Sequence, residues 1–416
     1  MALHLVGSIP LFTFSRLPPR RIAAPRAVAS ASSPIATTDL GHEAVARRSG
    51  NYKPCIWDLD YVQSLTSVYM GESYTGRAEE LKGNVRMMLA KVLDPLDQLE
   101  LIDNLQRLGL SYHFEDEIES ILKSIYIDSN SNYKWKEGEL YATALEFRLL
   151  RQHGFHVPQE VFNSFKDETG NFKACLCKDI KPMLCLYEAS FLSTEGETIL
   201  DEARDFTTRH LAESLEQNMD EYVAMQVSHA LELPLHWRMP RLETRWFIEI
   251  YERRKDKNPI LFELAKLDFN MVQAVHQDEL KNMSRWWRHT GVSEKLSFAR
   301  DRIVENFLWT VGETWEPQYG YCRRMSTKVH QLITTIDDVY DVYGTLDELE
   351  LFTDAVDRWE INAVEHLPDY MKICFHVLYN STNEMAYDTL KEQGSYILPY
   401  LKKAVINAFV FLNSSF

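Results

Sequence analysis

The chain has 416 residues, of which 45% are hydrophobic and 12% aromatic, and its formal net charge is −16. This length allows two or more domains with sizeable cores. The negative charge argues against a nucleic-acid partner and against anionic membranes. An anionic substrate would therefore need metal ions or well-placed arginines to bind.

The first segment differs in composition from the rest of the chain. Residues 1–38 contain no Asp or Glu, carry four arginines and are rich in serine and proline. Such a composition is typical of an organelle transit peptide, and we expect residues 1–46 to be one that directs the chain to a plastid. A secretory signal is a weaker alternative, because no long apolar segment is present. We expect no membrane span here or elsewhere in the sequence.

The middle of the chain predicts helices almost throughout. Leu99–Gly109 and Leu140–Gly154 repeat apolar residues at spacings of three and four, and each ends in glycine. Strand-like alternation is almost absent, and no glycine-rich phosphate loop occurs. We therefore expect an all-α fold. Two prolines in Leu233–Pro240 predict a break, and we place a domain boundary there, between residues 47–240 and 241–416.

Two arginines precede a predicted helix in the second domain. Arg300 and Arg302 flank Asp301, and a helix that contains Trp309 follows. A group of this kind is more often a surface charge cluster than a binding site. Guanidinium groups nevertheless bind phosphate oxygens in a bidentate way, so the pair would suit a diphosphate.

The most informative stretch is an aspartate cluster at the end of a largely apolar helix. Asp337 and Asp341 are four residues apart and would lie on one helix face, where their charges repel unless a cation lies between them. Asp338 points about 100° around the helix and would support the other two. Oxygen-only ligands suit Mg²⁺, which takes further ligands from substrate phosphates. The alternative is a solvated acidic helix end.

These motifs, in this order, resemble those of the plant terpene synthases of the monoterpene type. Arg47-Arg48, eight residues and Trp57 are similar to the tandem-arginine motif of that family. Arg300-Asp301-Arg302 is similar to its R-x-R motif, and Asp337-Asp338-x-x-Asp341 to its aspartate-rich metal motif. Each motif is moderate or weak by itself, whereas the combination is specific and the resemblance covers about residues 47–401.

The resemblance implies a helical, α-barrel-like N-terminal domain and a class I metal-binding helical bundle. The implied substrate is a prenyl diphosphate, with geranyl diphosphate preferred, and the implied cofactor is Mg²⁺ or Mn²⁺. Asp337, Asp338 and Asp341 are then the metal residues. Arg300 and Arg302 would hold the departing diphosphate, with Arg300, Asp337 and Asp341 contacting substrate.

Four further residues have implied roles in the same reaction. Trp309 would present its ring to the carbocation, although plain core packing is the alternative. Thr334, one turn before the aspartates, would line the cavity and contact substrate. Arg47 and Arg48 would close over the mouth and assist isomerisation of the substrate, the alternative being a charged chain terminus.

The sequence departs from the family near its end. The second metal motif of the family is not found after Tyr343, and fewer helices follow than the family bundle has. We therefore expect a truncated metal-binding domain, with weak activity or none. The alternatives are a sesquiterpene synthase, or an inactive helical isoform that binds diphosphate or a partner. His330 weakly favours a substrate larger than that of isoprene-forming relatives. We expect a monomer or a weak homodimer.

Overall fold

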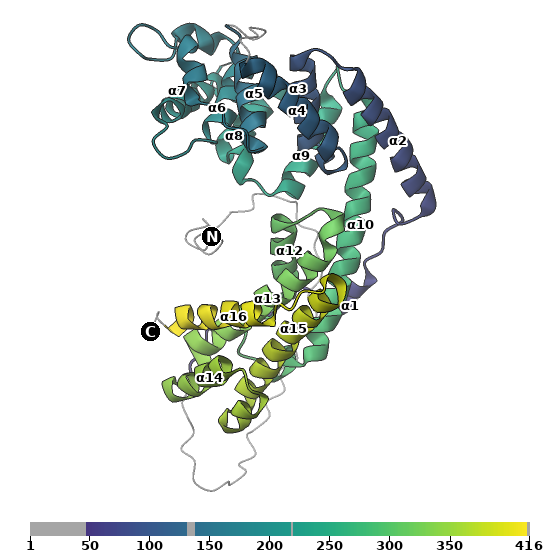
Figure 1. Cartoon of the computed structure of the whole chain (residues 1–416), viewed down its shortest axis with the longest axis vertical. Helices are drawn as coiled ribbons and strands as arrows, with labels where there is room; N and C mark the ends of the chain where they lie inside the picture. Colours follow the sequence, from purple (N-terminus) through teal and green to yellow (C-terminus); the bar gives the residue numbers. More distant parts are fainter. Residues whose placement is uncertain (1–46, 131–137, 218, 414–416) are drawn as a thin grey trace, which may run out of the picture. The chain divides into compact units, whose positions relative to one another are not determined.

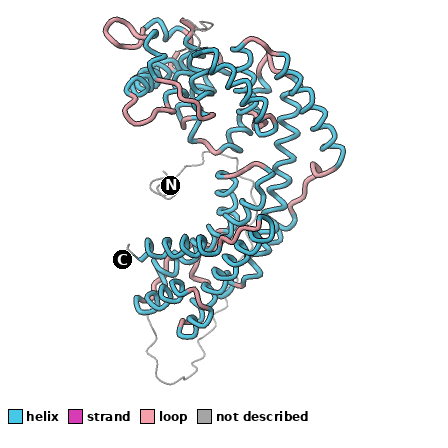
Figure 2. The backbone as a smooth tube through the Cα atoms, in the orientation of Figure 1, coloured by secondary structure: helices cyan, strands magenta, loops and turns pink. Residues whose placement is uncertain are grey.

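The computed structural model describes residues 47–130, 138–217 and 219–413. Helices make up nearly all of the secondary structure in these ranges (Figures 1 and 2). The described residues contain no β-strand, and an isolated bridge between Lys166 and Phe172 is their one β-type pairing. The predicted all-α fold is confirmed, whereas the predicted transit peptide lies outside the described residues.

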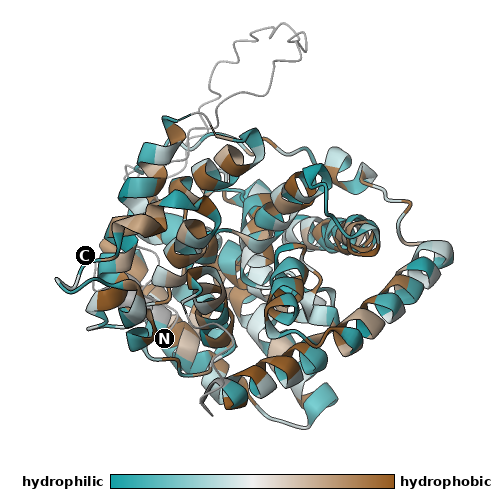
Figure 3. Ribbon diagram, turned by 90° about the horizontal axis from the view of Figure 1, so that it is seen from above, coloured by the Kyte–Doolittle hydropathy of each residue, from teal (hydrophilic) through white to brown (hydrophobic). Residues whose placement is uncertain are grey.

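The first group of helices builds the N-terminal half of the described chain. Its members are α1 (Leu59–Ser64), α2 (Glu72–Lys91), α3 (Pro95–Arg107), α4 (Glu115–Asn130), α5 (Leu140–Gln152), α6 (Ile180–Ser190), α7 (Thr198–Leu215), α8 (Glu221–Glu232) and α9 (Pro240–Arg253). Short 3₁₀ turns join several of them, at Ser111–His113, Gln159–Phe165, Ala174–Lys178 and Leu235–Trp237. Apolar and polar residues both occur around the helices (Figure 3), and the buried apolar residues of neighbouring helices pack against each other. Helix α5 is the exception, because it is buried along nearly its whole length.

The second group of helices carries the predicted metal and diphosphate motifs. Its members are α10 (Pro259–Thr290), α11 (Val292–Lys295), α12 (Ile303–Glu313), α13 (Gly320–Asp338), α14 (Leu346–Arg358), α15 (Asp369–Gln393) and α16 (Leu398–Asn413). Short turns at Pro317–Tyr319 and Ile361–His366 link them, and a π-helical turn, Val339–Tyr343, continues α13. None of the described helices meets the length and hydropathy that a membrane span requires.

Two hydrophobic cores share the 32-residue helix α10. The first core includes Leu261, Leu264 and Leu267 of α10, together with α9 and the helices before it. The second core begins at Met283 of the same helix and continues through α12, α13, α14 and α15. A third, smaller core lies among α6, α7 and α8. The two large cores thus divide along α10, and the domain boundary at Pro240 stays a prediction.

Candidate functional site

Helix α13 presents a stripe of residues that is apolar first and acidic at its end. Val329, Ile333, Asp337 and Asp341 follow one another at four-residue steps, and the first two are exposed at 37% and 48%. The opposite side of α13 is buried in the second core, which fixes the orientation of the stripe. An apolar surface thus leads directly to two carboxylates.

A π-helical turn places Asp341 at the end of this stripe. The backbone N–H of Gly344 donates to the carbonyl of Val339 at 2.7 Å, a five-residue spacing that widens the last turn. A Cβ atom on Gly344 would lie 2.9 Å from that carbonyl and 2.7 Å from Leu349, so only glycine fits without movement. Turns of this kind often occur at functional sites.

Arg300 binds two of the three predicted metal aspartates. Its backbone N–H donates to Asp338 at 2.6 Å, its Nε donates to Asp338 at 2.8 Å, and its Nη2 donates to Asp337 at 2.7 Å. Asp338 is fully buried, whereas the side chain of Asp337 is 34% exposed. Asp338 is therefore turned toward Arg300, while Asp337 and Asp341 remain on the accessible stripe.

The donor set fits a hard divalent cation. Among the described residues, no group of three or more His, Cys, Asp or Glu side chains is placed to hold a metal. That Asp337 and Asp341 hold a cation stays a prediction, in which water or phosphate oxygens would complete the coordination, as Mg²⁺ prefers. Burial, and then the nearby charge of Asp341, raise the pKa of Asp337. A bound cation would relieve both effects.

Trp309 and Thr334 lie on the accessible side of α12 and α13. Asn306 of α12 donates to Thr334 at 3.4 Å, and Glu313 at the end of α12 lies 3.5 Å from His330. Trp309 is one helical turn from both Asn306 and Glu313, and it is 52% exposed. Trp309 is therefore not packed in a core, and its contact with a carbocation stays a prediction.

An extended segment, residues 47–57, which we call the N-terminal strap, contacts the same site. Arg302 donates to the carbonyl of Lys53 at 2.7 Å. The guanidinium of Arg300 lies 4.9 Å from the ring centre of Tyr52. Burial, and next a hydrogen bond to Asp338, raise the pKa of Tyr52. The strap therefore touches both arginines of the R-x-R motif.

Arg47, the first residue of the strap, is bound by residues that follow helix α13 in the chain. Arg47 donates through both Nη atoms to Glu348, at 2.7 Å for the longer bond, and to the carbonyl of Tyr343 at 3.1 Å. Its guanidinium packs against the rings of Tyr343 and Tyr370, and Tyr370 also donates to Glu348 at 2.8 Å. Arg48, in contrast, is exposed. The two arginines of the tandem motif thus have different environments.

We expect Glu348→Gln to loosen the strap without unwinding α14. Glu348 also closes a capping box with Thr345, and glutamine can replace glutamate in that role. Loss of the charged pair should weaken the attachment of the strap by about 1 kcal/mol, which raises the equilibrium constant for its opening about fivefold. Hydrogen exchange across residues 49–57 measures this opening, with Arg48→Gln as the matched control. Equal exchange in Glu348→Gln and the unaltered chain would contradict the clamp.

The same clamp predicts the pH dependence of strap attachment. The hydrogen bond from Arg47 is the main cause that lowers the pKa of Glu348 to about 2. A lowered carboxyl pKa stabilises the folded state above the ordinary pKa of Glu, and this contribution is lost as the pH falls toward 2. After correction for the intrinsic pH dependence of amide exchange, the protection of the strap should therefore stay constant between about pH 5 and pH 8.

Sequence reasoning missed Glu348 and Tyr52 as parts of this site. The Thr345-x-x-Glu348 spacing signals a helix cap, but nothing in it indicates a partner 301 residues away. Tyr52 stands in a short polar stretch with no helical or strand periodicity. Both residues become recognisable only when the strap is placed against the metal helix.

Family models match both halves of the chain. The model "Terpene synthase, N-terminal domain" matches residues 56–231, and "Terpene synthase family, metal binding domain" matches residues 288–412. The second match contains Arg300, Arg302, Asp337 and Asp341. It confirms that the chain carries a metal-binding domain, while the individual residue roles stay predictions.

Characterised relatives match nearly the whole chain. It is 63% identical to (−)-alpha-terpineol synthase from Vitis vinifera, over 97% of this chain and 69% of that protein. It is 60% identical to the chloroplastic myrcene synthase from Quercus ilex, over 98% of this chain and 70% of that protein. The relatives are thus longer than the chain described here.

Solved structures show the same fold. A limonene synthase complex with 2-fluorolinalyl diphosphate has a TM-score of 0.85 and 49% identity, covering 88% of this chain and 68% of that one. Isoprene synthase from grey poplar, in complex with three Mg²⁺ ions and dimethylallyl-S-thiolodiphosphate, has a TM-score of 0.78 and 52% identity, covering 86% and 67%. With both domain models and these identities, the chain belongs to the terpene synthase family, whose members are lyases acting on diphosphates.

Proposed function

We propose that this chain ionises geranyl diphosphate, in the presence of Mg²⁺, to form a monoterpene. The observation that carries the proposal is the junction on α13 of an apolar stripe with Asp337 and Asp341, faced by Arg300. A prenyl diphosphate has the same two-part character, with an apolar chain joined to a charged group. The names of the relatives, terpineol, myrcene and limonene synthase, support a monoterpene product.

The contacts described above support the residue roles in this proposal. When bound, Mg²⁺ would neutralise the diphosphate and stabilise it as a leaving group. Asp337 and Asp341 hold the cation side of the site, while Asp338 holds Arg300 in place. Arg300 and Arg302 stand where a departing diphosphate needs positive charge. Trp309 offers a ring face to the carbocation, a contact worth about 0.5–2 kcal/mol, and Thr334 borders the same surface.

We further propose that the 416-residue chain turns over slowly. Val329, Ile333 and Trp309 are accessible to solvent in the described structure, and a carbocation beside them would be captured by water. The strap contacts Arg300 and Arg302 through Tyr52 and Lys53, whereas Val329 and Ile333 of the apolar stripe stay exposed. We also propose that the chain is a monomer or weak homodimer and that it acts in a plastid, as the chloroplastic relatives suggest.

Product analysis tests this proposal directly. The chain is incubated with Mg²⁺ and either geranyl or farnesyl diphosphate, and volatile products are quantified by gas chromatography beside the Vitis terpineol synthase. We expect monoterpenes from geranyl diphosphate at a rate at least about a hundredfold below that of the relative. Turnover equal to the relative would refute slow catalysis, and preference for farnesyl diphosphate would make the chain a sesquiterpene synthase. Diphosphate binding with no product would indicate an inactive binding isoform.

A further inference from the structure

Two side-chain amides connect the R-x-R segment, residues 300–302, to the metal helix. Gln331 of α13 donates through Nε2 to the backbone carbonyl of Arg300 at 3.3 Å. Its Oε1 accepts from Nδ2 of Asn306 of α12 at 2.9 Å, and the same Nδ2 also donates to the hydroxyl of Thr334 at 3.4 Å. These bonds, which we call the amide chain, run from the backbone of Arg300 to the accessible side of α13.

Gln331 and Asp338 hold the two backbone groups of Arg300. Asp338 accepts from the backbone N–H at 2.6 Å, while Gln331 donates to the backbone carbonyl. The two side chains are seven residues apart, which is about two helical turns, so they lie on the same side of α13. Both are fully buried. The guanidinium of Arg300 therefore extends from a backbone that α13 fixes on both sides.

The other carbonyls of the R-x-R segment are bound by nearby groups. The carbonyl of Asp301 accepts from Nη1 of Arg302 at 2.8 Å. The carbonyl of Arg302 accepts from the backbone N–H of Asn306, also at 2.8 Å. A buried backbone carbonyl without a partner is costly, so each of these bonds matters for the conformation of the segment. Gln331 supplies the bond that comes from the metal helix.

The carbonyl of Arg300 determines the orientation of both amides. A backbone carbonyl can only accept, so Nε2 of Gln331 must face it, and Oε1 then faces Asn306. Asn306 must in turn present its NH₂ group to that oxygen. Reversal of either amide, or of both, would place two oxygens or two NH₂ groups against each other. The two amides therefore act as one unit.

A second polar bridge joins the same two helices without reaching Arg300. The hydroxyls of Thr310 of α12 and Thr327 of α13 lie 2.9 Å apart, and both side chains are buried. Thr310 follows Asn306 by one helical turn, and Thr327 precedes Gln331 by one turn. Among the described residues, the other hydrogen bonds of these hydroxyls go to carbonyls of their own helices. This hydroxyl bridge therefore supports packing alone.

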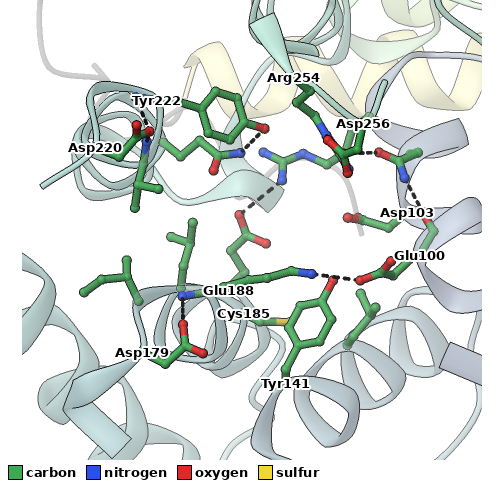
Figure 4. Close-up of a pocket in the computed structure, with 18 of the residues that line it drawn as sticks. Glu100, Asp103, Tyr141, Asp179, Cys185, Glu188, Asp220, Tyr222, Arg254 and Asp256 are labelled. Carbon is green, nitrogen blue, oxygen red and sulfur yellow. Dashed lines mark hydrogen bonds and ion pairs between the residues drawn. The ribbon is translucent and has the colours of Figure 1, made fainter. Parts of the chain in front are cut away.

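The charged groups among the N-terminal helices are also separate from the amide chain. They line a cavity of about 810 Å³ (Figure 4). Within its lining, Arg148 donates to Asp103 at 2.5 Å and Lys181 donates to Glu100 at 2.8 Å. These ion pairs connect α3 to α5 and α6. None of the lining residues belongs to the R-x-R segment or to α13.

We propose that Gln331 and Asn306 are positioning residues, which hold the backbone of Arg300 so that its guanidinium stands where the departing diphosphate needs positive charge. This inference rests on the role of Arg300 in the proposed function. Nε of Arg300 binds Asp338 and Nη2 binds Asp337, so a displaced backbone would disturb both contacts. A misplaced charge stabilises the diphosphate less, and its affinity falls.

Titration calorimetry with inorganic diphosphate and Mg²⁺ tests the amide chain. Gln331→Met removes both amide bonds with little change in volume, and should weaken diphosphate binding at least about tenfold. Asn306→Leu leaves the bond from Gln331 to Arg300 in place, and should weaken binding about threefold. The double variant should bind as Gln331→Met does, because Asn306 acts through Gln331.

Thr327→Val is the matched control, since it removes the hydroxyl bridge between the same two helices. Thr327→Val and Gln331→Met should both lower the melting temperature, but Thr327→Val should leave the diphosphate affinity unchanged. Hydrogen exchange of the backbone amide of Arg300 gives a second measurement, which needs no ligand. We expect faster exchange in Gln331→Met and unchanged exchange in Thr327→Val.

The possible failures are distinguishable. If the unaltered chain binds no diphosphate, the proposed function fails and this inference fails with it. If the unaltered chain binds diphosphate and Gln331→Met binds it equally well, the positioning role alone is refuted. An equal loss in Thr327→Val would assign the effect to packing, and additive losses in the double variant would refute the single unit. If circular dichroism shows that Gln331→Met does not fold, the comparison of Asn306→Leu with Thr327→Val decides.

Discussion

Asp337→Asn and Asp341→Asn are each expected to abolish Mg²⁺-dependent binding of diphosphate and to lower turnover of geranyl diphosphate at least about a thousandfold. The two carboxylates are the accessible oxygen donors at the end of the α13 stripe. Asparagine keeps the shape of each side chain but removes one of the two negative charges that a divalent cation needs there. Neither the remaining carboxylate nor Arg300 can replace it.

The stability of the Asp337 variant separates this effect from misfolding. Burial and the charge of Asp341 raise the pKa of Asp337, so the folded protein disfavours its negative charge. A raised carboxyl pKa means that stability falls as the pH rises through the ordinary range of Asp toward the folded-state pKa. The neutral Asn should therefore leave the melting temperature unchanged or higher at neutral pH, although one bond from Arg300 is lost.

Calorimetric titration with inorganic diphosphate, with and without Mg²⁺, measures the loss of Mg²⁺-dependent diphosphate binding. The measurement does not require that the variant has detectable turnover. Asp347→Asn is the matched control, because Asp347 is an exposed carboxylate six residues beyond Asp341. It should bind diphosphate as the unaltered chain does. Unchanged Mg²⁺-dependent affinity in Asp337→Asn and Asp341→Asn would mean that the metal is held elsewhere.

Local patterns were sufficient to predict the helices and the order of the motifs. The periodicity of Leu99–Gly109 and Leu140–Gly154 predicted helices that the structure places at Pro95–Arg107 and Leu140–Gln152. The spacing of Asp337 and Asp341 predicted a shared accessible face, because side-chain direction along a helix depends on neighbouring residues alone. The π-helical turn after Asp338 was not predicted, since it depends on the close approach of Gly344 to Leu349.

Contacts between distant segments could not be predicted in the same way. Arg300 and Asp338 are 38 residues apart, and Arg47 and Glu348 are 301 residues apart. Helical geometry predicted that Asp338 points away from Asp337 and Asp341, but its partner follows only from the packing of α12 on α13.

Asp338→Asn is expected to destabilise the fold and to misplace Arg300, because Asp338 is fully buried and receives both the backbone and side-chain donors of that arginine. The amide offers one acceptor where the carboxylate offers two, and its NH₂ group faces the donors of Arg300. Leaving a cation without its buried partner costs about 2–3 kcal/mol at a site that is open on one side. The melting temperature should fall by several degrees.

The dependence on Mg²⁺ distinguishes a positioning residue from a metal ligand. If Asp338 acts through Arg300, Asp338→Asn weakens diphosphate binding while the Mg²⁺ concentration for half-maximal binding stays close to that of the unaltered chain. Arg300→Lys, which keeps the charge and the backbone N–H, should weaken diphosphate binding similarly and retain more stability. A large rise in the required Mg²⁺ concentration, with no fall in melting temperature, would instead mean that Asp338 binds the metal directly. The unchanged melting temperature would show that Arg300 keeps its pairing, so the lower metal affinity would come from a lost bond to the metal.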